Sequence, residues 1–394
     1  MQTINVAILL LAGEALKAGS PWAIHWTGPE ILLSSIMIAW GAEAAQYFMA
    51  QGIALAILAL LQTLPEFAVE AVLAWHQQTE YLLANLTGAL RLLTGLGWPL
   101  IYLAAATAYR KDIQAPMRVI RLTESQAMQV VGLMFGLVWQ FVVWAKGSLG
   151  LVDAAVLLAV YVGYLLMMRR LPPEKPESVE DMEAIPRKIV TSPRGIRIAL
   201  ILGLFVVGGV GVFAVAQPFL EGLFALSVSA GIPIFVFIAW VAPLVSEAPE
   251  GISAFYWARD YPRANTALMN LVSSNISQWT LMAAMLPVVL SISMGRPAAI
   301  PMDALQSREL LMTLGQALVG VLLLMDLELE WWEAVALFVL WAVQVAYSIL
   351  APDSVVHTWF IGIYFAWAGV ELIRLVIGQR KPLALIHFRV LITR

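Results

Sequence analysis

Two Pro-Glu pairs inside apolar stretches are the residues best placed to do chemistry. Pro65-Glu66 lies in LLQTLPEFAVEAVLAW, and Pro249-Glu250 lies in PLVSEAPEGISAFYWA, 184 residues further along. A proline inside a helix removes a backbone N–H donor and frees a carbonyl one turn upstream. The nearby carboxylate needs a compensating partner in such an apolar setting. Freed carbonyls and carboxylates are hard oxygen ligands of the kind that Ca²⁺ prefers, so each pair is a candidate half of a cation site.

An asparagine follows each Pro-Glu pair at a matched distance. Asn85 lies in ANLTGALRLLTG and Asn270 in MNLVSSNISQWTL, 185 residues apart, and each stands 19 or 20 residues after its glutamate. Each motif therefore extends over two consecutive helices. An ordinary kink with a glutamate paired inside the bundle would explain one such motif equally well. Two motifs with the same spacing favour an internal repeat that builds a site.

The composition shows where these helices must lie. Of 394 residues, 61% are hydrophobic and only 12% are charged, and the mean hydropathy is +0.83, whereas ordinary soluble domains carry about 25% charged residues. These values exclude a soluble enzyme, and the net charge of −3 excludes a nucleic-acid binder. The chain has no cysteine, and no nucleotide-binding, hydrolase or zinc-protease motif occurs. We therefore expect a lipid-embedded protein without a cofactor, and not an enzyme.

Apolar stretches of about 20 residues, enough to span a bilayer, predict five spans before a polar segment and six after it. The predicted spans are 30–48, 52–76, 80–109, 125–145, 149–169, 196–217, 229–258, 264–293, 306–326, 331–351 and 355–378. The polar segment 171–195 contains five prolines and mixed charges, which favour a solvated linker. Residues 1–18 are expected to form an extra helix or a membrane-surface segment.

Lysines and arginines gather after odd-numbered spans, which predicts that those connections lie on the cytoplasmic side. The groups are Arg110, Lys111, Arg118 and Arg121; Arg169, Arg170, Lys175, Arg187, Lys188, Arg194 and Arg197; Arg259 and Arg263; and Arg380, Lys381, Arg389 and Arg394. Five spans before the linker is an odd number, so the second half must run with opposite topology. Inverted repeats with broken helices are how secondary transporters build ion sites.

The motifs resemble the alpha repeats of the cation/calcium antiporter superfamily, which includes the sodium/calcium exchanger family. Those repeats read approximately G-T-S-L-P-E and G-N-x-x-G-S-N-x-x-N, and the matching segments here are TLPE (63–66), ANLTGA (84–89), SEAPE (246–250) and MNLVSSN (269–275). The resemblance implies an all-α polytopic membrane protein, an inverted repeat of two five-helix halves with the sodium/calcium exchanger fold, plus one additional C-terminal helix. The expected parts are an N-terminal apolar or interfacial segment (1–29), a first repeat (30–170, motif 62–93), a cytoplasmic linker (171–195), a second repeat (196–351, motif 246–278) and a C-terminal helix with a basic tail (352–394).

The resemblance also implies which residues bind the cation. The family's paired central glutamates fall on Glu66 and Glu250. Side-chain oxygens are expected from Gln62, Thr63, Asn85, Ser246, Asn270, Ser274 and Gln278. Repeat one has lost two polar positions, because Ala89 and Leu93 stand where repeat two has Ser274 and Gln278. A family exchanger that binds one Ca²⁺ or about three Na⁺ uses ligands from both repeats, so this difference predicts a departure from that stoichiometry.

Four further charges lie inside the apolar stretches. Glu70 and Glu247 share a helix face with Glu66 and Glu250. Arg91 is six residues beyond Asn85, off the Asn85 face. One hypothesis is that Arg91 pairs with Glu66 or Glu70 and replaces one bound cation; the other is that it snorkels to the interface or pairs structurally with Glu70. Glu43 either lines the cavity or is a buried hydrogen-bonded glutamate.

The sequence therefore predicts a secondary cation antiporter that exchanges Ca²⁺ or a related cation for Na⁺ or H⁺ by alternating access, in the bilayer of a prokaryotic cell membrane. One alternative keeps the fold and changes the ions to Na⁺/H⁺ or to another divalent metal such as Mg²⁺. Another is a non-transporting exchanger-like protein, although such a scaffold would have no reason to keep two intramembrane carboxylates.

Overall fold

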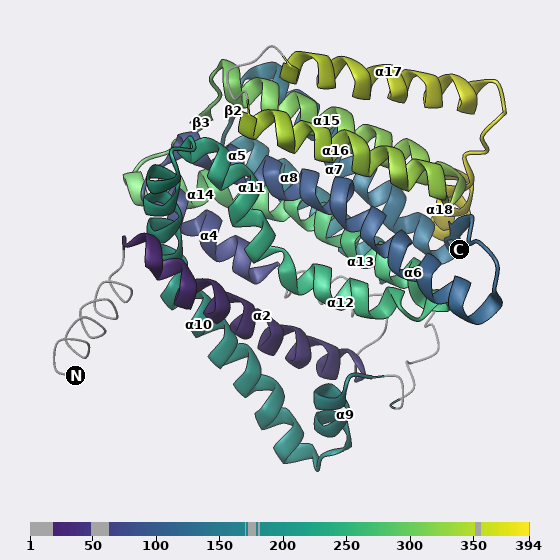
Figure 1. The fold of residues 1–394 in the computed structure, drawn as a ribbon, viewed down its shortest axis with the longest axis horizontal. Coiled ribbons are helices and arrows are strands. Elements are labelled where there is room, and N and C mark those ends of the chain that lie inside the picture. Colours follow the sequence, from purple (N-terminus) through teal and green to yellow (C-terminus); the bar gives the residue numbers. More distant parts are fainter. Residues whose placement is uncertain are drawn as a thin grey trace, which may run out of the picture.

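Long helices lying side by side make up nearly all of the structure, which is a computed structural model (Figure 1). It describes residues 19–48, 63–169, 171, 179, 182–350 and 356–393. The expectations for residues 1–18 and for Gln62 lie outside the described residues. The predicted all-α membrane fold is confirmed: eight described helices are long and apolar enough to cross a bilayer, and a bent helix pair makes a ninth candidate.

The helices follow the predicted spans closely in order. The first half contains α2 (Ile24–Gln46, preceded by the turn η1, Pro21–Ala23), α4 (Leu64–Trp75), α5 (Thr79–Leu92), η2 (Leu93–Gly97), α6 (Trp98–Ile113), η3 (Glu124–Gln126), α7 (Ala127–Lys146) and α8 (Leu151–Met168). The second half contains α10 (Arg194–Ala230), α11 (Ile234–Ser246), α12 (Ala248–Ala258), η5 (Tyr261–Arg263), α13 (Ala264–Ser277), η6 (Gln278–Met282), α14 (Ala283–Met294), α15 (Ala304–Leu323), η7 (Leu324–Asp326) and α16 (Trp331–Leu350). Two further helices follow, α17 (Val356–Val376) and α18 (Leu383–Thr393).

The internal repeat is visible in two places outside the Pro-Glu motifs. A π-helical turn interrupts the third span of each half, at η2 and at η6, whose first residues are 185 positions apart. Strand β1 (Val119–Arg121) pairs with β4 (Glu328–Glu330), and β2 (Ser148–Leu149) pairs with β3 (Ile300–Pro301), both antiparallel. The loops after α6 and α15 thus meet, as do the loops after α7 and α14. This pairing agrees with the predicted sidedness, in which loops after odd-numbered spans share one side.

Helices α2 and α10 form a tightly packed pair beside the rest of the bundle (Figure 1). Gly208 and Gly211 of α10 allow this approach, because a Cβ atom on them would lie 2.6 Å and 2.2 Å from the Ser34 carbonyl and hydroxyl oxygens. Small residues at helix contacts are typical of membrane helices that pack backbone to backbone. A small apolar cluster joins the pair to α4, and its buried members are Ile38, Ala68, Val212 and Ala216.

Three segments differ from the expectation. The linker contains a helix, α9 (Ala184–Thr191), instead of being solvated throughout, because Pro186, Ile189 and Val190 bury an apolar face. Helix α10 continues to Ala230 instead of ending near 217. The predicted basic tail forms a largely apolar helix, α18, which packs on α7. Helices α9 and α18 are too short to be found in a search for apolar stretches of spanning length, with 8 and 11 residues.

Candidate functional site

Glu66 and Glu250 occupy the same place in two short helices. Each is the third residue of its helix, α4 or α12, and follows the proline at the second position. Both side chains are fully buried. The first helical turn tolerates proline, since its missing N–H would have no partner there. The N-terminal end of a helix also favours a carboxylate through its exposed N–H groups. Between α11 and α12 the chain bends by 54°, which places the second of these helix starts inside the bundle.

A glutamine joins carboxyl groups from the two halves. The Gln278 amide nitrogen, at the start of η6, donates to Glu66 Oε2 at 2.7 Å and also to Glu247 Oε1. The two carboxyl groups are thus held by the same amide group. Glu247 stands between α11 and α12, so the chain break of the second half faces the first turn of α4.

Glu70 has a different partner. It lies one turn after Glu66 on α4, and its Oε1 accepts a hydrogen bond of 3.0 Å from the Asn85 amide of α5. Both residues are fully buried. The sequence predicted that Glu70 is a modulating charge and that Asn85 is a ligand. The structure places the two side chains in direct contact.

Many acceptor atoms around these contacts have no hydrogen-bond partner on another residue. They are Glu66 Oε1, Glu70 Oε2, Asn85 Oδ1, Glu247 Oε2, both carboxyl oxygens of Glu250, Ser274 Oγ and Gln278 Oε1. None of the four glutamates forms an ion pair with a basic side chain in the described part of the structure. Buried acceptors without donors are costly, and a hard cation or a proton would satisfy them.

The carboxyl groups do not form a closed cage. Within the described ranges, no three acidic or histidine side chains are close enough together to hold a metal ion. The Gln278 amide instead lies against both Glu66 and Glu247. Rotation of this amide by half a turn would exchange its donor for its acceptor and present a third oxygen beside the two carboxyl groups.

The remaining predicted ligands that the structure describes are also buried. Thr63 precedes α4, and its carbonyl accepts the Phe67 N–H at 3.0 Å. The Ser246 hydroxyl donates to the Ala242 carbonyl at 3.2 Å at the end of α11. Asn270 and Ser274 lie one turn apart on α13, both buried. The structure therefore brings Glu66, Glu247 and Gln278 together and records a second contact between Glu70 and Asn85.

Comparison with known proteins decides the family. The sequence model described as "Sodium/calcium exchanger protein" matches residues 29–169 and 200–350, one segment in each half. The chain belongs to the sodium/calcium exchanger family. This family consists of secondary transporters and not of enzymes, so the exchanger is a cation antiporter. No functionally curated protein shows significant similarity to it.

Solved structures support the same conclusion. A crystal structure of the H⁺/Ca²⁺ exchanger CAX is 28% identical, with 98% of this chain and 97% of that chain covered and a TM-score of 0.83. The sodium-calcium exchanger NCX_Mj soaked with 100 mM Na⁺ and 10 mM Sr²⁺ is 17% identical over 83% of this chain and 97% of that chain, with a TM-score of 0.56. Native YfkE is 14% identical over 87% and 99%, with a TM-score of 0.62. The last two support the fold alone.

Arg91 of the exchanger pairs with neither Glu66 nor Glu70, so both predicted pairings are wrong. Its Nη1 lies 2.5 Å from Glu309 Oε2 of α15, and its guanidinium lies 4.7 Å from the centre of the Trp240 ring of α11. Arg91 is fully buried, which also excludes snorkelling to the interface. The physical reason is its angular position on α5, which points it away from the Asn85 face. Glu309, a lone glutamate inside the predicted span 306–326, was the signal that sequence reasoning missed.

Glu43 lies in the last turn of α2. Its Oε1 accepts the Glu183 backbone N–H at 3.3 Å, so it contacts the linker. Sequence reasoning also missed the hydrogen bond of 3.2 Å from Asn275 to the Thr94 hydroxyl, which joins α13 to η2.

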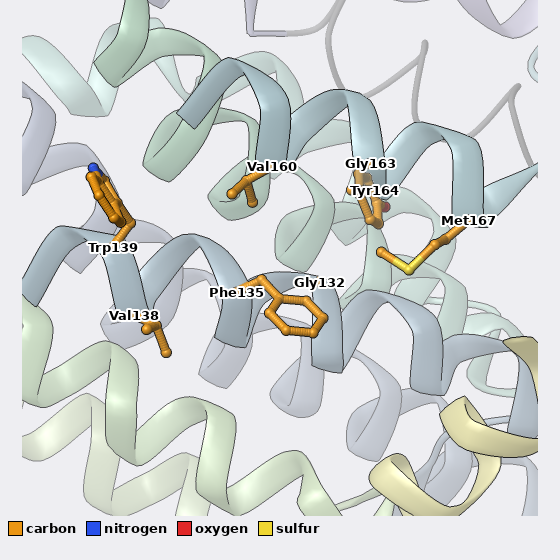
Figure 2. A pocket seen from close by; sticks show the side chains of 8 residues that line it. All are labelled: Gly132, Phe135, Val138, Trp139, Val160, Gly163, Tyr164 and Met167. Carbon is orange, nitrogen blue, oxygen red and sulfur yellow. The ribbon is translucent and has the colours of Figure 1, made fainter. Parts of the chain in front are cut away.

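A separate apolar cavity of about 330 Å³ lies between α7 and α8 (Figure 2). Its lining residues are Gly132, Phe135, Val138, Trp139, Val160, Gly163, Tyr164 and Met167. The Tyr164 hydroxyl reaches Ser273 of α13 at 3.5 Å. The cavity holds none of the predicted ligands, and its apolar lining is unsuited to an inorganic cation.

Proposed function

We propose that this exchanger transports Ca²⁺ against H⁺, with Glu66 and Glu250 as the central ligands. Oxygens from Gln62, Thr63, Asn85, Ser246, Asn270, Ser274 and Gln278 complete the site over the transport cycle. Glu70 and Glu247 belong to the same site as additional carboxylates. The protein sits in a prokaryotic cell membrane, with the linker 171–195 and the C-terminus on the cytoplasmic side.

The contact of Gln278 with Glu66 and Glu247 carries this proposal. It links the first half to the second through buried carboxyl groups, as a site shared by two inverted repeats requires. The amide N–H groups now satisfy oxygens that a divalent cation would otherwise coordinate. Binding of Ca²⁺ would therefore need the amide to turn and any protonated carboxyl group to lose its proton.

Among the described residues, none of the four glutamates forms an ion pair with a basic side chain, which supports proton coupling. Four buried carboxyl groups cannot all remain ionised at close range without a cation. Protons and Ca²⁺ thus compete for the same oxygens, which is the requirement for exchange. The similarity to an H⁺/Ca²⁺ exchanger at 28% identity points the same way.

Alternating access would come from sliding of the α2–α10 pair against the core. The cluster of Ile38, Ala68, Val212 and Ala216 lies at this boundary, and its side chains are apolar. Ala68 lies two residues from both Glu66 and Glu70 on α4 and therefore on the opposite face of that helix, so displacement of the pair would reach the carboxyl groups through a movement of α4.

Reconstitution in liposomes tests the proposal. Wild-type protein should accumulate ⁴⁵Ca²⁺ when a pH gradient is imposed, with proton movement reported by an internal pH dye. Glu66→Gln and Glu250→Gln should each abolish both signals, since an amide neither loses a proton nor supplies a charged ligand. Glu221→Gln is the matched control, because Glu221 lies on α10 and pairs with Gln217 at 2.9 Å. Wild-type exchange rates in both site variants would contradict the proposal.

The same liposomes test the proposed exchange of Ca²⁺ for H⁺ against its alternatives. The missing polar groups at Ala89 and Leu93 favour a reduced number of bound ions, and Na⁺/H⁺ or Mg²⁺ exchange would be consistent with that. Uptake driven by a Na⁺ gradient at constant pH would replace H⁺ by Na⁺. Transport of Mg²⁺ but not of Ca²⁺ would change the substrate, and no flux with any ion would favour a non-transporting protein.

A further inference from the structure

The linker helix α9 packs across the ends of both peripheral helices. It lies next to the end of α2 and the beginning of α10 (Figure 1). Its buried residues Ile189 and Val190 share an apolar cluster with Met182 and with Ala44 of α2, and Leu204 of α10 packs against the same cluster. The linker therefore has a folded part that contacts both members of the pair.

Two hydrogen bonds attach the start of α9 to α2. The Trp40 indole N–H donates to Glu183 Oε2 at 2.8 Å, and the Glu183 backbone N–H donates to Glu43 Oε1 at 3.3 Å. Glu183 immediately precedes α9. One residue of the linker is thus held by both its side chain and its backbone.

Arg197 closes the arrangement from α10. Its guanidinium lies 3.9 Å from the centre of the Phe48 ring at the end of α2, and its Nη1 donates to the Val190 carbonyl at 3.3 Å. We call these contacts of α9 with the two helices the α9 clamp, defined by Trp40, Glu43, Phe48, Glu183 and Arg197. The α9 clamp therefore joins the end of α2 to the beginning of α10.

The outer face of the clamp is basic. Arg187, Lys188 and Arg194 are exposed, and the exposed apolar residue Ile185 lies beside them. They precede the membrane-spanning part of α10 directly. Basic residues on an amphipathic helix beside a spanning helix are attracted to an anionic membrane surface. The apolar side chain beside them suits the headgroup boundary.

We propose that the basic face of α9 binds anionic lipid headgroups and, through the α9 clamp, holds the α2–α10 pair at a fixed depth in the membrane. Sliding of the pair is part of the proposed function, so the effect on transport rests on that proposal, whereas lipid binding does not. Anionic lipid slows exchange, because α9 must leave the headgroup layer whenever the pair moves. High salt relieves the effect by screening the charges.

Two measurements on the full-length protein test this. Lipid binding is measured as phosphatidylglycerol retained through gel filtration of protein in detergent, and exchange is measured in phosphatidylcholine liposomes with and without phosphatidylglycerol. The test variant replaces Arg187, Lys188 and Arg194 by Gln. The control replaces Arg110, Lys111 and Arg118, exposed basic residues predicted for the same side, by Gln.

Wild-type protein and the control are expected to retain phosphatidylglycerol and to exchange about fivefold more slowly in anionic liposomes, a factor that corresponds to roughly 1 kcal/mol. The test variant should lose the retained lipid and exchange equally fast in both liposomes. Equal lipid retention by test variant and control would overturn the proposal.

Trp40→Phe tests the clamp, because it removes one clamp hydrogen bond. This variant should retain the lipid, but the lipid should slow its exchange less than in the wild type; an unchanged effect would overturn the role of the clamp. If the chain carries out no exchange at all, the retained lipid still reports on the basic face by itself.

Discussion

Arg91 and Glu309 form a buried ion pair 218 residues apart in sequence, with 2.5 Å between Nη1 and Oε2. The Arg91 side chain is completely buried, and that of Glu309 is 3% exposed. Thr313 Oγ1 accepts a further bond from Nη1 at 3.2 Å. The pair connects α5 to α15, and the Trp240 ring brings α11 into the same cluster. Its charges compensate each other, so in the described part of the chain Arg91 is not the partner of any of the four glutamates of the proposed cation site.

Removal of either member of the pair should destabilise the exchanger strongly. Arg91→Met leaves Glu309 as a buried charge without its partner, which costs about 3–5 kcal/mol. Glu309→Met leaves the guanidinium unpaired at a similar cost. The double variant should recover most of the loss, because a well-packed apolar pair can replace a buried ion pair. Thermal unfolding in detergent measures all three.

Arg121→Gln is the matched control for the ion pair. Arg121 and Glu328 form a pair at 3.1 Å whose side chains are 77% and 38% exposed, and exposed pairs contribute only about 0–1 kcal/mol. The double variant should also keep the wild-type preference among Ca²⁺, Mg²⁺ and Na⁺. A change in ion preference would mean that Arg91 acts on the cation site after all.

Replacement of Gln278 should impair transport more than stability. Gln278→Leu removes the amide that contacts both Glu66 and Glu247, so the site loses one oxygen ligand and the contact between the halves. We expect ⁴⁵Ca²⁺ exchange to fall at least about tenfold, the equivalent of roughly 1.4 kcal/mol. Gln140→Leu is the control, because Gln140 is also buried and donates to the neighbouring Trp279 carbonyl at 2.7 Å. Equal transport losses in the two variants would assign Gln278 a structural role only.

Arg380 should hold the C-terminal helices to the core. Its guanidinium donates to the Leu323 carbonyl at 3.0 Å, lies 3.0 Å from Asp326 and also contacts Glu333. Burial lowers the pKa of Arg380, but Glu333 and Asp326 more than offset this and leave the pKa raised above its ordinary value. A raised pKa means that the charge is present at every pH below it, so the arginine itself adds no pH dependence near neutrality.

Arg380→Ala should therefore lower the unfolding temperature and expose α18 to proteolysis across the neutral pH range. Arg380→Lys should give partial rescue, because lysine keeps the charge but cannot reproduce the planar arrangement of donors. Lys381→Ala is the control, since Lys381 is the exposed neighbour. Wild-type resistance to proteolysis in Arg380→Ala would show that apolar packing on α7 is sufficient.

The repeated pattern in the sequence predicted the helix starts that carry the candidate site, because these depend on local rules. A proline and a glutamate at the start of a helix, and an asparagine on the next helix, recur at fixed spacing, and the helices formed where apolar stretches reached spanning length. The family resemblance then supplied the pairing of Glu66 with Glu250 as ligands, which stays a prediction; the structure places the two glutamates at equal positions in α4 and α12.

The partners of individual charges could not be predicted in the same way. Arg91 pairs with Glu309, and Gln278 hydrogen-bonds both Glu66 and Glu247, only after helices from different halves have packed. Helical spacing identifies which residues share a face of one helix but does not identify the neighbouring helix. Helix α9 escaped prediction for another reason: its apolar face has only three buried residues, and a proline-rich, charged composition surrounds it.

Gly88 should be needed for the approach of α5 to α11. A Cβ atom at this position would lie 1.9 Å from the Ala239 carbonyl oxygen, so even alanine must push the helices apart. The contact lies one turn after Asn85 and next to Trp240, between the two halves. Gly88→Ala should therefore lower stability by about 1–3 kcal/mol through overpacking and slow exchange as well. Gly163→Ala is the control, because a Cβ atom there has nothing within 4 Å and alanine favours a helix over glycine by about 1 kcal/mol. The two substitutions should shift the unfolding temperature in opposite directions, and a shift of the same sign in both would contradict the close packing of α5 on α11.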